Sequence, residues 1–382
     1  MVSDNEPTVV AFPFVGDLVG GSHISALHLI RSLDPKRYRP LVLMHQTDGP
    51  VAELFDREQV AYEPAPVKRC LEGGPGDAVF FLRDLKRLER FLRERKVRLL
   101  HTNDGRMHVT WQLAGRLAGV KCLWHHRGNP GAFGLNKVAP WTADHLITVS
   151  RFSAPAGSRW TSANSSVVHS PFDIDDIQAD RSACRKALID ELAVSPDTAL
   201  ISYFGALIAR KRPVMFADIT AAMTRRAAPR AVRGLVFGDD PEGLAEPTVA
   251  RAAELGVSED LRMMGYRYPP TPWMAASDVL MVPAVDEPLG RTLVEAMLLG
   301  TPVVASDSGG NPEAIDDGRT GFIVPPDDAD AFAERACQLI NDPALRRRIV
   351  DQAREEAVAR FSLERHVRSV TEIYDQLLSA AS

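Results

Sequence analysis

From residue 283 to residue 313 the chain reads PAVDEPLGRTLVEAMLLGTPVVASDSGGNPE. The apolar run before this stretch ends at Pro283, which is typical of a buried strand that leads into a loop. Apolar side chains then recur at helical spacing from about residue 290 to residue 299, and Gly300 is a stop signal. Residues 301–305 are the next apolar run. The stretch therefore predicts a strand, a loop, a helix and a second strand.

Two glutamates of this stretch are predicted to flank a phosphate site. Glu287 falls in the loop at the carboxyl end of the first strand, where ligands of open α/β sheets bind, and Glu295 falls inside the helix. Gly290, Arg291 and Thr292 open that helix, so their backbone N–H groups lack intrahelical partners and suit a phosphate. We therefore expect a nucleoside diphosphate at the helix start, with one carboxylate near a sugar and the other near a ribose.

Taken alone, the two glutamates would fit solvated surface charges equally well, but the longer pattern favours a site. Seven residues separate the acids, and Ala-Met, a small-residue turn, Pro-Val-Val and a Gly-Gly-x-x-Glu loop follow, with GRTGFIVP at residues 318–325. This pattern resembles the nucleotide-sugar site of retaining glycosyltransferases of family 4. The resemblance implies an α/β chain of GT-B architecture, in which two doubly wound, Rossmann-like domains face each other across a cleft and a C-terminal helix returns to the N-terminal domain.

The length and charge of the chain limit what it can be. A chain of 382 residues is long enough for two domains with separate cores. Its 45 basic and 50 acidic residues give a net charge of −5, which argues against a general nucleic-acid binder. Four scattered cysteines without a C-x-x-C pair, a polar N-terminus and no apolar run of membrane-spanning length favour a cytoplasmic protein.

Strand-like and helical runs alternate along most of the chain, which predicts parallel sheets with helical crossovers. The expected strands are residues 9–14, 40–44, 98–101, 120–125, 146–149, 166–169, 199–204, 234–237, 261–264, 279–282 and 302–305. A proline-containing acidic stretch at residues 170–177 predicts the domain boundary. We expect an acceptor-side domain over residues 1–172 and a donor-binding domain over residues 173–362. The resemblance implies that residues 363–382 return to the first domain.

The loop after the first strand is a candidate for contact with the donor phosphates or the acceptor. Gly20 and Gly21 would allow a ligand to approach the backbone, and Ser22 is the expected N-cap of the next helix. Glycines alone would fit an ordinary turn, but the family has a Gly-Gly loop at this position. Asp17, in the same loop, is a weaker candidate for contact with an acceptor hydroxyl.

Polar residues also end two later strands of the first half. His125 and His126 follow the run at residues 120–123, and the resemblance implies a functional histidine here that orients the transferred sugar. His125 is the better match and His126 the second choice, because successive side chains at a strand end point to opposite sides. Asn103 and Asp104 end another strand, where contact with the acceptor and capping of a turn are equally good interpretations.

The second half contains a basic turn that suits a diphosphate leaving group. Without a metal, the charge on a departing diphosphate needs fixed cations and backbone donors, and neither a metal nor a cofactor is expected. The resemblance implies an arginine directly after Gly205 and a lysine five residues later. Lys211 matches the lysine, but Ala206 stands in place of the arginine. Among nearby residues, Arg210 and Arg291 are the favoured replacements and Arg212 the third.

Two other segments have weaker signals. Tyr266 follows the strand at residues 261–264, near which relatives hold the nucleobase, so it is a donor-binding candidate. Residues 83–98 hold eight basic residues against three acids on a helical pattern. Such a helix can dock on anionic lipid, which would place the protein peripherally on the inner face of the membrane. A solvated face with i,i+4 ion pairs is the more common outcome.

The sequence thus predicts a retaining, metal-independent glycosyltransferase that uses a nucleoside diphosphate sugar, with uridine diphosphate the first choice of carrier and guanosine diphosphate the second. In this interpretation His125 and Glu287 are the catalytic residues. The acceptor would be a glycan, a lipid-linked molecule or a small molecule. The alternatives are a sugar-nucleotide epimerase, a glucan synthase, or a non-catalytic subunit that binds a nucleotide sugar.

Overall fold

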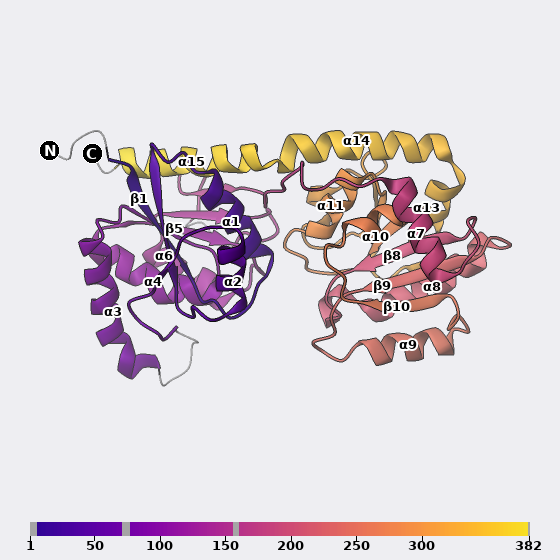
Figure 1. Ribbon diagram of the computed structural model, residues 1–382, viewed down its shortest axis with the longest axis horizontal. Coiled ribbons are helices and arrows are strands. Elements are labelled where there is room, and N and C mark those ends of the chain that lie inside the picture. The colour runs from indigo at the N-terminus through magenta and orange to yellow at the C-terminus, as the bar shows by residue number, and fades with distance from the viewer. Residues whose placement is uncertain (1–5, 71–76, 156–159, 381–382) are drawn as a thin grey trace. The chain divides into compact units, whose positions relative to one another are not determined.

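The computed structural model describes residues 6–70, 77–155 and 160–380. For residues 77–81 it describes the backbone alone. The chain divides into two compact units. Unit 1 comprises Met1–Pro171 and Leu363–Ser382, and unit 2 comprises Phe172–Ser362. The division predicted from the sequence differs from this one by a single residue. Each unit is built on one parallel sheet (Figure 1).

Unit 1 has a seven-stranded sheet in the order β3-β2-β1-β4-β5-β6-β7. The strands are β1 (Thr8–Phe14), β2 (Tyr38–Met44), β3 (Glu63–Pro64), β4 (Leu99–Thr102), β5 (Lys121–His126), β6 (His145–Thr148) and β7 (Ser165–Val167). The helices are α1 (Gly21–Ser32), α2 (Pro50–Arg57), α3 (Asp77–Glu94), α4 (Gly105–Ala118), α5 (Phe133–Lys137), α6 (Ala139–Thr142) and α15 (Leu363–Ser379). The two-residue edge strand β3 was not predicted, because it is too short to show any periodicity.

Unit 2 has a six-stranded sheet in the order β10-β9-β8-β11-β12-β13. Its strands are β8 (Ala199–Phe204), β9 (Val232–Phe237), β10 (Leu261–Gly265), β11 (Val279–Val282), β12 (Val303–Ser306) and β13 (Phe322–Val324). Its helices are α7 (Arg181–Leu192), the 3-10 turn η1 (Ala209–Lys211), α8 (Pro213–Ala227), α9 (Ala245–Glu254), α10 (Thr271–Ala276), α11 (Arg291–Leu299), α12 (Asn311–Ala314), α13 (Ala329–Asn341) and α14 (Pro343–Phe361). The short β13 was not among the expected strands.

Alternate residues of β1 pack on opposite faces of the first sheet. Val10, Phe12 and Phe14 belong to one buried cluster, whereas Val9 and Ala11 belong to another that lies under α3 and α4. A strand that is covered on both faces has no polar side to show, so it reads in the sequence as a continuous apolar run. This burial explains why the central strands could be located from the sequence.

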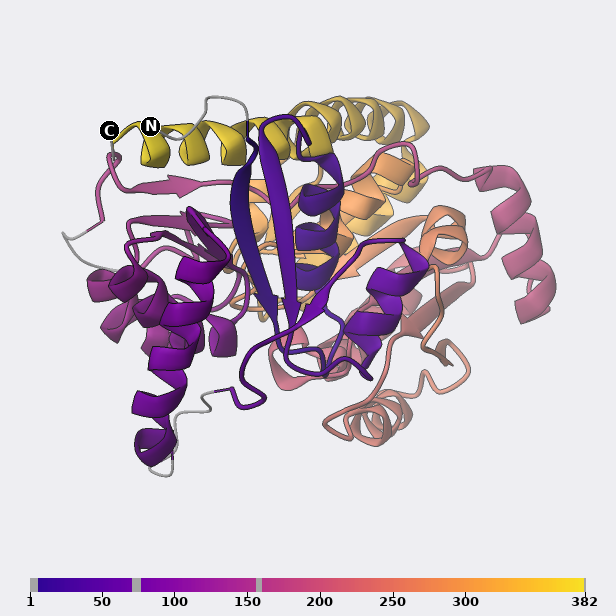
Figure 2. The ribbon, with the colours of Figure 1, turned by 60° about the vertical axis from the view of Figure 1, so that its left-hand side comes forward.

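Helix α15 completes unit 1 by covering one face of this sheet. Its buried side chains, Val370, Ile373, Tyr374 and Leu377, recur at three- and four-residue spacing and join the cluster that contains Phe12. In Figure 2 this yellow helix runs beside the indigo β1 and α1. The apolar stripe of α15 is therefore what attaches the C-terminal segment to unit 1.

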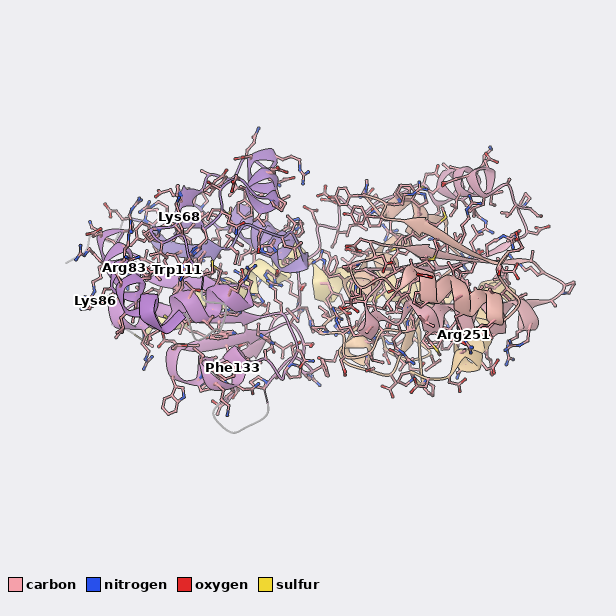
Figure 3. The ribbon with its side chains drawn as sticks, turned by 90° about the horizontal axis from the view of Figure 1, so that it is seen from below. Lys68, Arg83, Lys86, Trp111, Phe133 and Arg251 are labelled. Carbon is pink, nitrogen blue, oxygen red and sulfur yellow. The ribbon has the colours of Figure 1, made fainter. Side chains whose placement is uncertain are left out.

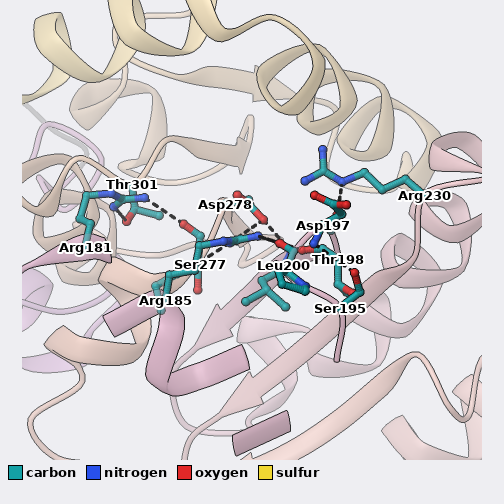
Figure 4. Close-up of polar contacts among 12 residues, drawn as sticks. Arg181, Arg185, Ser195, Asp197, Thr198, Leu200, Arg230, Ser277, Asp278 and Thr301 are labelled. Carbon is teal, nitrogen blue, oxygen red and sulfur yellow. Dashed lines mark hydrogen bonds and ion pairs between the residues drawn. The ribbon is translucent and has the colours of Figure 1, made fainter. Parts of the chain in front are cut away.

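A polar clamp fixes α7 to the start of two central strands of unit 2 (Figure 4). Asp278, just before β11, accepts hydrogen bonds from the Leu200 amide at 2.8 Å and from Arg185 at 3.0 Å. Arg185 also donates to the Thr198 carbonyl at 2.9 Å. Only 7% of the Asp278 side chain is exposed. The clamp lies at the amino ends of the strands, away from the edge where ligands of such sheets bind, so its role is structural.

Replacing Asp278 by alanine should lower the free energy of unfolding by about 3 kcal/mol, because the substitution leaves the Arg185 guanidinium without its buried anion and the Leu200 amide without an acceptor. Urea denaturation followed by circular dichroism measures the loss. Asp190→Ala is the matched control, since Asp190 pairs with Lys186 on the surface of the same helix. The control should show no measurable change. Equal midpoints for wild type and Asp278→Ala would show that the clamp does not stabilise the fold.

Candidate active site

The loop that carries Glu287 is held in place by two glycines. The Gly310 amide donates a 2.7 Å hydrogen bond to the carbonyl oxygen of Glu287. Gly309 adopts φ +61°, and a Cβ there would lie 2.6 Å from the backbone nitrogen of Glu287. A Cβ at Gly310 would lie 2.3 Å from the carbonyl oxygen of Pro288. Because any other residue would push the loop away, the Gly-Gly pair fixes the position of Glu287 at the end of β11.

Two cations gather at the end of the neighbouring strand β8. Arg210 forms an ion pair with Glu287, and its carbonyl accepts the Val285 amide at 2.8 Å. Lys211 crosses over Gly205, since a Cβ on that glycine would lie 2.8 Å from the lysine Nζ. The Glu287 side chain is 14% exposed. Arg210, Lys211 and Glu287 thus meet at the carboxyl ends of two adjacent strands.

The start of α11 faces the same edge of the sheet. Its N-cap is Gly290, and no side chain of the described residues caps it. The guanidinium of Arg291 lies 4.3 Å from the ring centroid of Phe172, and its nitrogen lies 3.7 Å from a carboxylate oxygen of Glu295. The first backbone N–H groups of α11 thus have no side-chain cap among the described residues, while the Arg291 side chain is held over an aromatic ring.

These contacts bear on which residue could replace the arginine missing at Ala206. Arg212 donates to the carbonyl of Pro326 at 2.6 Å and pairs with Asp327, and Arg291 is engaged as described above. Of the three candidates, Arg210 is the one whose guanidinium reaches the Glu287 carboxylate. The geometry of unit 2 therefore favours Arg210. Tyr266, by contrast, is 67% exposed beyond the end of β10.

The loop after β1 differs from the expectation in its capping. Helix α1 begins at Gly21 with Gly20 as its N-cap, so the prediction of Ser22 as N-cap was wrong. The ring of His23 takes the capping role, because its Nδ1 accepts the Gly20 amide at 3.1 Å. Among the described residues, a Cβ at Gly20 would contact that ring alone, at 3.9 Å. Asp17 forms a 2.5 Å ion pair with Arg106 of α4.

The glycine that the fold requires in this loop is one that the sequence interpretation did not select. Gly16 has φ +107°, and a Cβ there would lie 2.3 Å from the carbonyl oxygen of Gln46. Because Gly20 and Gly21 were conspicuous as a pair, the single glycine was overlooked. Its signal is its position two residues after the buried strand β1, where the chain has to turn.

The two adjacent histidines of β5 have separate partners. His126 Nε2 bonds to the carbonyl oxygen of Asn129 at 3.0 Å, so it serves its own turn. His125 is fully buried, and its Nδ1 lies 3.1 Å from Nε2 of His101. Its Nε2 has no hydrogen-bond partner within the part of the chain that the structure describes. His125 therefore has a ring nitrogen left for a ligand.

The end of β4 holds further buried polar atoms that have no hydrogen-bond partner among the described residues. Asp104 is the N-cap of α4 through a 2.9 Å bond to the Met107 amide, as in the capping interpretation, but its second carboxylate oxygen has no partner among the described residues. The same holds for both side-chain polar atoms of Asn103, which is 3% exposed. Buried polar groups are normally satisfied, so their clustering makes the ends of β4 and β5 a candidate ligand site.

Parts of this chain are similar to known proteins. Residues 198–342 match the family model described as Glycosyl transferases group 1. A D-inositol 3-phosphate glycosyltransferase of Saccharomonospora viridis is 32% identical over 217 residues, which cover 54% of this chain and 49% of the relative. The lipopolysaccharide core biosynthesis glycosyltransferase LpsE of Rhizobium meliloti is 36% identical over 129 residues, covering 34% and 37%. This chain thus spans about half, or less, of the length of the curated relatives it matches.

The fold has solved counterparts. The crystal structure of Anabaena Alr3699/HepE in complex with UDP superposes with a TM-score of 0.80 at 20% identity, covering 96% of this chain and 99% of that one. The same protein in complex with UDP-glucose gives 0.78. Two Rossmann-like units, with the C-terminal helix assigned to the first, make up the GT-B fold of glycosyltransferases. The match to the model described as Glycosyl transferases group 1 lies within unit 2.

Burial gives Asp104 a pH signature. Desolvation raises the pKa of this carboxyl to about 6, above the value of about 4 expected in the unfolded chain. The native state therefore binds a proton between these two values that the unfolded state has lost, and this contribution to stability disappears as the pH rises through 6. Asp104→Asn keeps the capping acceptor but does not titrate.

As the pH rises from 4 to 7.5, the wild type should lose stability relative to Asp104→Asn. The difference between their free energies of unfolding should change by up to about 3 kcal/mol in favour of the variant. Urea titrations at a series of pH values measure the difference. Asp34→Asn, at an exposed position of the same unit, is the control for replacing a carboxylate by an amide. Curves of Asp104→Asn and wild type that run parallel would show that burial does not raise the pKa of Asp104 in the folded protein.

Proposed function

We propose that this protein is a metal-independent, retaining glycosyltransferase that moves a sugar from a nucleoside diphosphate sugar to an acceptor hydroxyl. The observation that carries the proposal is the meeting of Arg210, Lys211 and Glu287 beside the uncapped start of α11. A departing diphosphate develops negative charge, and fixed cations with oriented N–H groups stabilise that charge without any rearrangement. The match of residues 198–342 to the model of group 1 glycosyl transferases supports the same chemistry.

Each residue has a defined task in this proposal. Lys211 and the amides at Gly290–Thr292 bind the diphosphate, and Glu295 accepts a hydrogen bond from the ribose. Glu287 accepts hydrogen bonds from hydroxyls of the donor sugar, and His125 of unit 1 orients that sugar. Retention follows from the family resemblance, with an oxygen of the departing phosphate taking the proton of the acceptor on the same face.

In this proposal the diphosphate binds to Arg210 before the sugar binds to Glu287, because the two side chains form an ion pair with each other. Without donor, each side chain neutralises the other. An incoming diphosphate competes for the guanidinium, because its two phosphates together carry two negative charges against the single charge of the carboxylate, and arginine binds both kinds of group. The release of Arg210 frees the Glu287 carboxylate to accept hydrogen bonds from the sugar. Arg210 thereby supplies the charge that Ala206 lacks.

Uridine diphosphate is the favoured carrier, since the structural counterpart HepE has been crystallised with UDP and UDP-glucose. Guanosine diphosphate is the second choice. The named relatives act on D-inositol 3-phosphate or in lipopolysaccharide core synthesis. We propose an acceptor of the same broad chemistry, a hydroxyl of a small polar molecule, a lipid-linked molecule or a glycan.

Glu287→Ala should lower turnover by a factor of about 10² or more, because the hydrogen bonds it offers strengthen as the sugar departs. Release of nucleoside diphosphate from UDP- and GDP-sugars, with a panel of acceptors, measures the turnover. Glu334→Gln, at an exposed position of α13, is the matched control and should keep the wild-type rate. A Glu287→Ala variant as fast as the wild type would remove this residue from the mechanism.

The rival functions separate in the same assays. A sugar-nucleotide epimerase would form product from the donor alone, and a glucan synthase would require a polysaccharide acceptor. A binding subunit, which Ala206 alone favours, would bind UDP-sugar in calorimetry but release no diphosphate with any acceptor. The presence of Lys211, Glu287 and Glu295 argues against that last alternative.

We also propose that α3 can place unit 1 at an anionic lipid surface. Leu85, Leu88 and Leu92 are buried against the sheet, and Arg95 is paired with Glu63 at 2.5 Å. The opposite face exposes Lys86, Arg87 and Arg90, for which no acidic partner occurs within the described ranges. Figure 3 shows Arg83 and Lys86 at the outer edge of this unit. None of the described helices is long and apolar enough to cross a bilayer, so contact would be peripheral.

Replacing Lys86, Arg87 and Arg90 together by alanine should reduce binding to vesicles of phosphatidylglycerol, since each basic residue near such a surface contributes about 1 kcal/mol. Co-sedimentation at 50 and 300 mM salt measures the binding. The triple replacement of Arg225, Arg226 and Arg230 in unit 2 is the matched control and should bind like the wild type. Wild-type binding by the α3 variant, or no binding by the wild-type protein, would exclude this helix as a membrane contact.

A further inference from the structure

A chain of buried hydrogen bonds in unit 1 ends on His125. The hydroxyl of Tyr374, on α15, lies 2.5 Å from Nδ1 of His101. Nε2 of His101 lies 3.1 Å from Nδ1 of His125. All three side chains are fully buried, and the rings of His101 and His125 stack with centroids 5.3 Å apart. The consecutive strands β4 and β5 and the distant helix α15 thus form one continuous line of polar contacts.

The two ends of this series of hydrogen bonds determine which atom donates and which accepts in each bond. At one end, Arg127 approaches Nδ1 of His125 at 3.4 Å, and a guanidinium can only donate. At the other end, His101 is the one hydrogen-bond partner of the Tyr374 hydroxyl within the described chain. A buried O–H needs an acceptor, so Tyr374 donates to His101. His101 must then donate from Nε2, and Nδ1 of His125 accepts from both His101 and Arg127.

The charge state of the rings agrees with this direction. Burial, followed by the positive charge of Arg127, holds the pKa of His101 and of His125 well below the usual range. Both imidazoles are therefore neutral at pH 7, and each has a single ring proton. With Nδ1 of His125 accepting, its proton resides on Nε2, the nitrogen that lacks a partner among the described residues. His125 consequently presents a hydrogen-bond donor.

We propose that Tyr374 and His101 are positioning residues that hold His125 in its Nε2–H tautomer, so that it donates to an oxygen of the bound donor sugar. This inference rests on the proposed function for its ligand, but the tautomer is a property of the protein alone. It gives the returning helix α15 a chemical role besides packing. A ring in the other tautomer would offer the sugar hydroxyl a lone pair and no proton.

A neighbouring ring provides an internal reference for the test. His366, also on α15, lies against His125 with ring centroids 5.8 Å apart. Its Nδ1 lies 2.7 Å from the carbonyl oxygen of His169, so this nitrogen must donate. Burial lowers the pKa of His366 to about 3, so it is neutral too. His366 should therefore be the Nδ1–H tautomer, the opposite of His125.

The tautomers can be determined directly from ring ¹⁵N chemical shifts in the full chain labelled with ¹⁵N-histidine, at pH 7.5 and without ligand. Signals of His125 and His101 are assigned from the spectra of His125→Gln and His101→Gln. We expect a protonated Nε2 and a bare Nδ1 for both residues, and the reverse for His366. A protonated Nδ1 on His125 in the wild-type spectrum would overturn the proposal, whether or not the protein transfers sugar.

Two tyrosine variants test whether Tyr374 and His101 hold His125 in its Nε2–H tautomer. Tyr374→Phe removes the hydroxyl that donates to His101, and should shift the His101 and His125 nitrogens toward a mixture of tautomers. We expect kcat to fall about tenfold, as for other orienting partners of functional histidines, with the KM for donor changed by less than about twofold. Tyr38→Phe is the matched control, because Tyr38 packs edge-on against Tyr374 at 5.4 Å but bonds to Asp375. It should leave spectrum and kcat unchanged.

The conservative variant His101→Gln keeps an N–H that can reach His125, and should retain more activity than His101→Leu. If the ring ¹⁵N chemical shifts of His125 are unchanged in both Tyr374→Phe and His101→Leu, these two residues do not set its tautomer. If the wild-type protein transfers no sugar at all, the proposed function fails, while the ring shifts still decide the tautomer.

Discussion

The pairing of β8 with β11 is the contact on which the donor half-site depends. Val279 and Leu280 lie in parallel register with Ile201 and Ser202, although some eighty residues of chain separate the strands. Because parallel strands present their carboxyl ends at the same edge, this register brings the turn after β8 beside the loop after β11. Arg210 and Glu287 meet for this reason. The Asp278 bond to the Leu200 amide secures the same register from the opposite end of the strands.

Unit 1 repeats this arrangement with different side chains. Its sheet also reverses its order next to a central strand, between β1 and β4, and Val10 and Ala11 pair with Leu99 and Leu100 there. The crossover helices leave the sheet in opposite directions at such a point and open a crevice at the carboxyl ends. In unit 2 the crevice is lined by charges that pair with each other. In unit 1 the ends of β4 and β5 hold buried polar atoms of Asn103, Asp104 and His125 that have no hydrogen-bond partner among the described residues.

The parts of this picture that could be predicted from sequence are those encoded locally. The buried central strands read as apolar runs, and the expected bounds of β8 and β11 agree with the structure. The distance in sequence between Glu287 and α11 is short, so their relation follows from one loop and one helix. The choice between Arg210 and Arg291 could not be made in this way, because it depends on where Phe172, far away in the chain, places its ring.

The hydrogen bonds that link Tyr374, His101 and His125 show most clearly what could not be predicted from the sequence. Tyr374 and His101 are 273 residues apart, and each has an ordinary local explanation, one as part of the apolar stripe of a helix and the other as the end of a strand. No spacing rule links them, so the pair was overlooked in favour of Asn103 and Asp104. A helix that packs by a stripe of Val370, Ile373 and Leu377 could carry phenylalanine at position 374 with equal burial. The hydroxyl adds a polar group to an apolar face, a cost that packing alone does not require. Among the described residues it bonds to His101, which in turn bonds to His125. Local packing therefore accounts for the ring of Tyr374, whereas its oxygen is accounted for by the direction that it gives to the hydrogen bonds ending at His125.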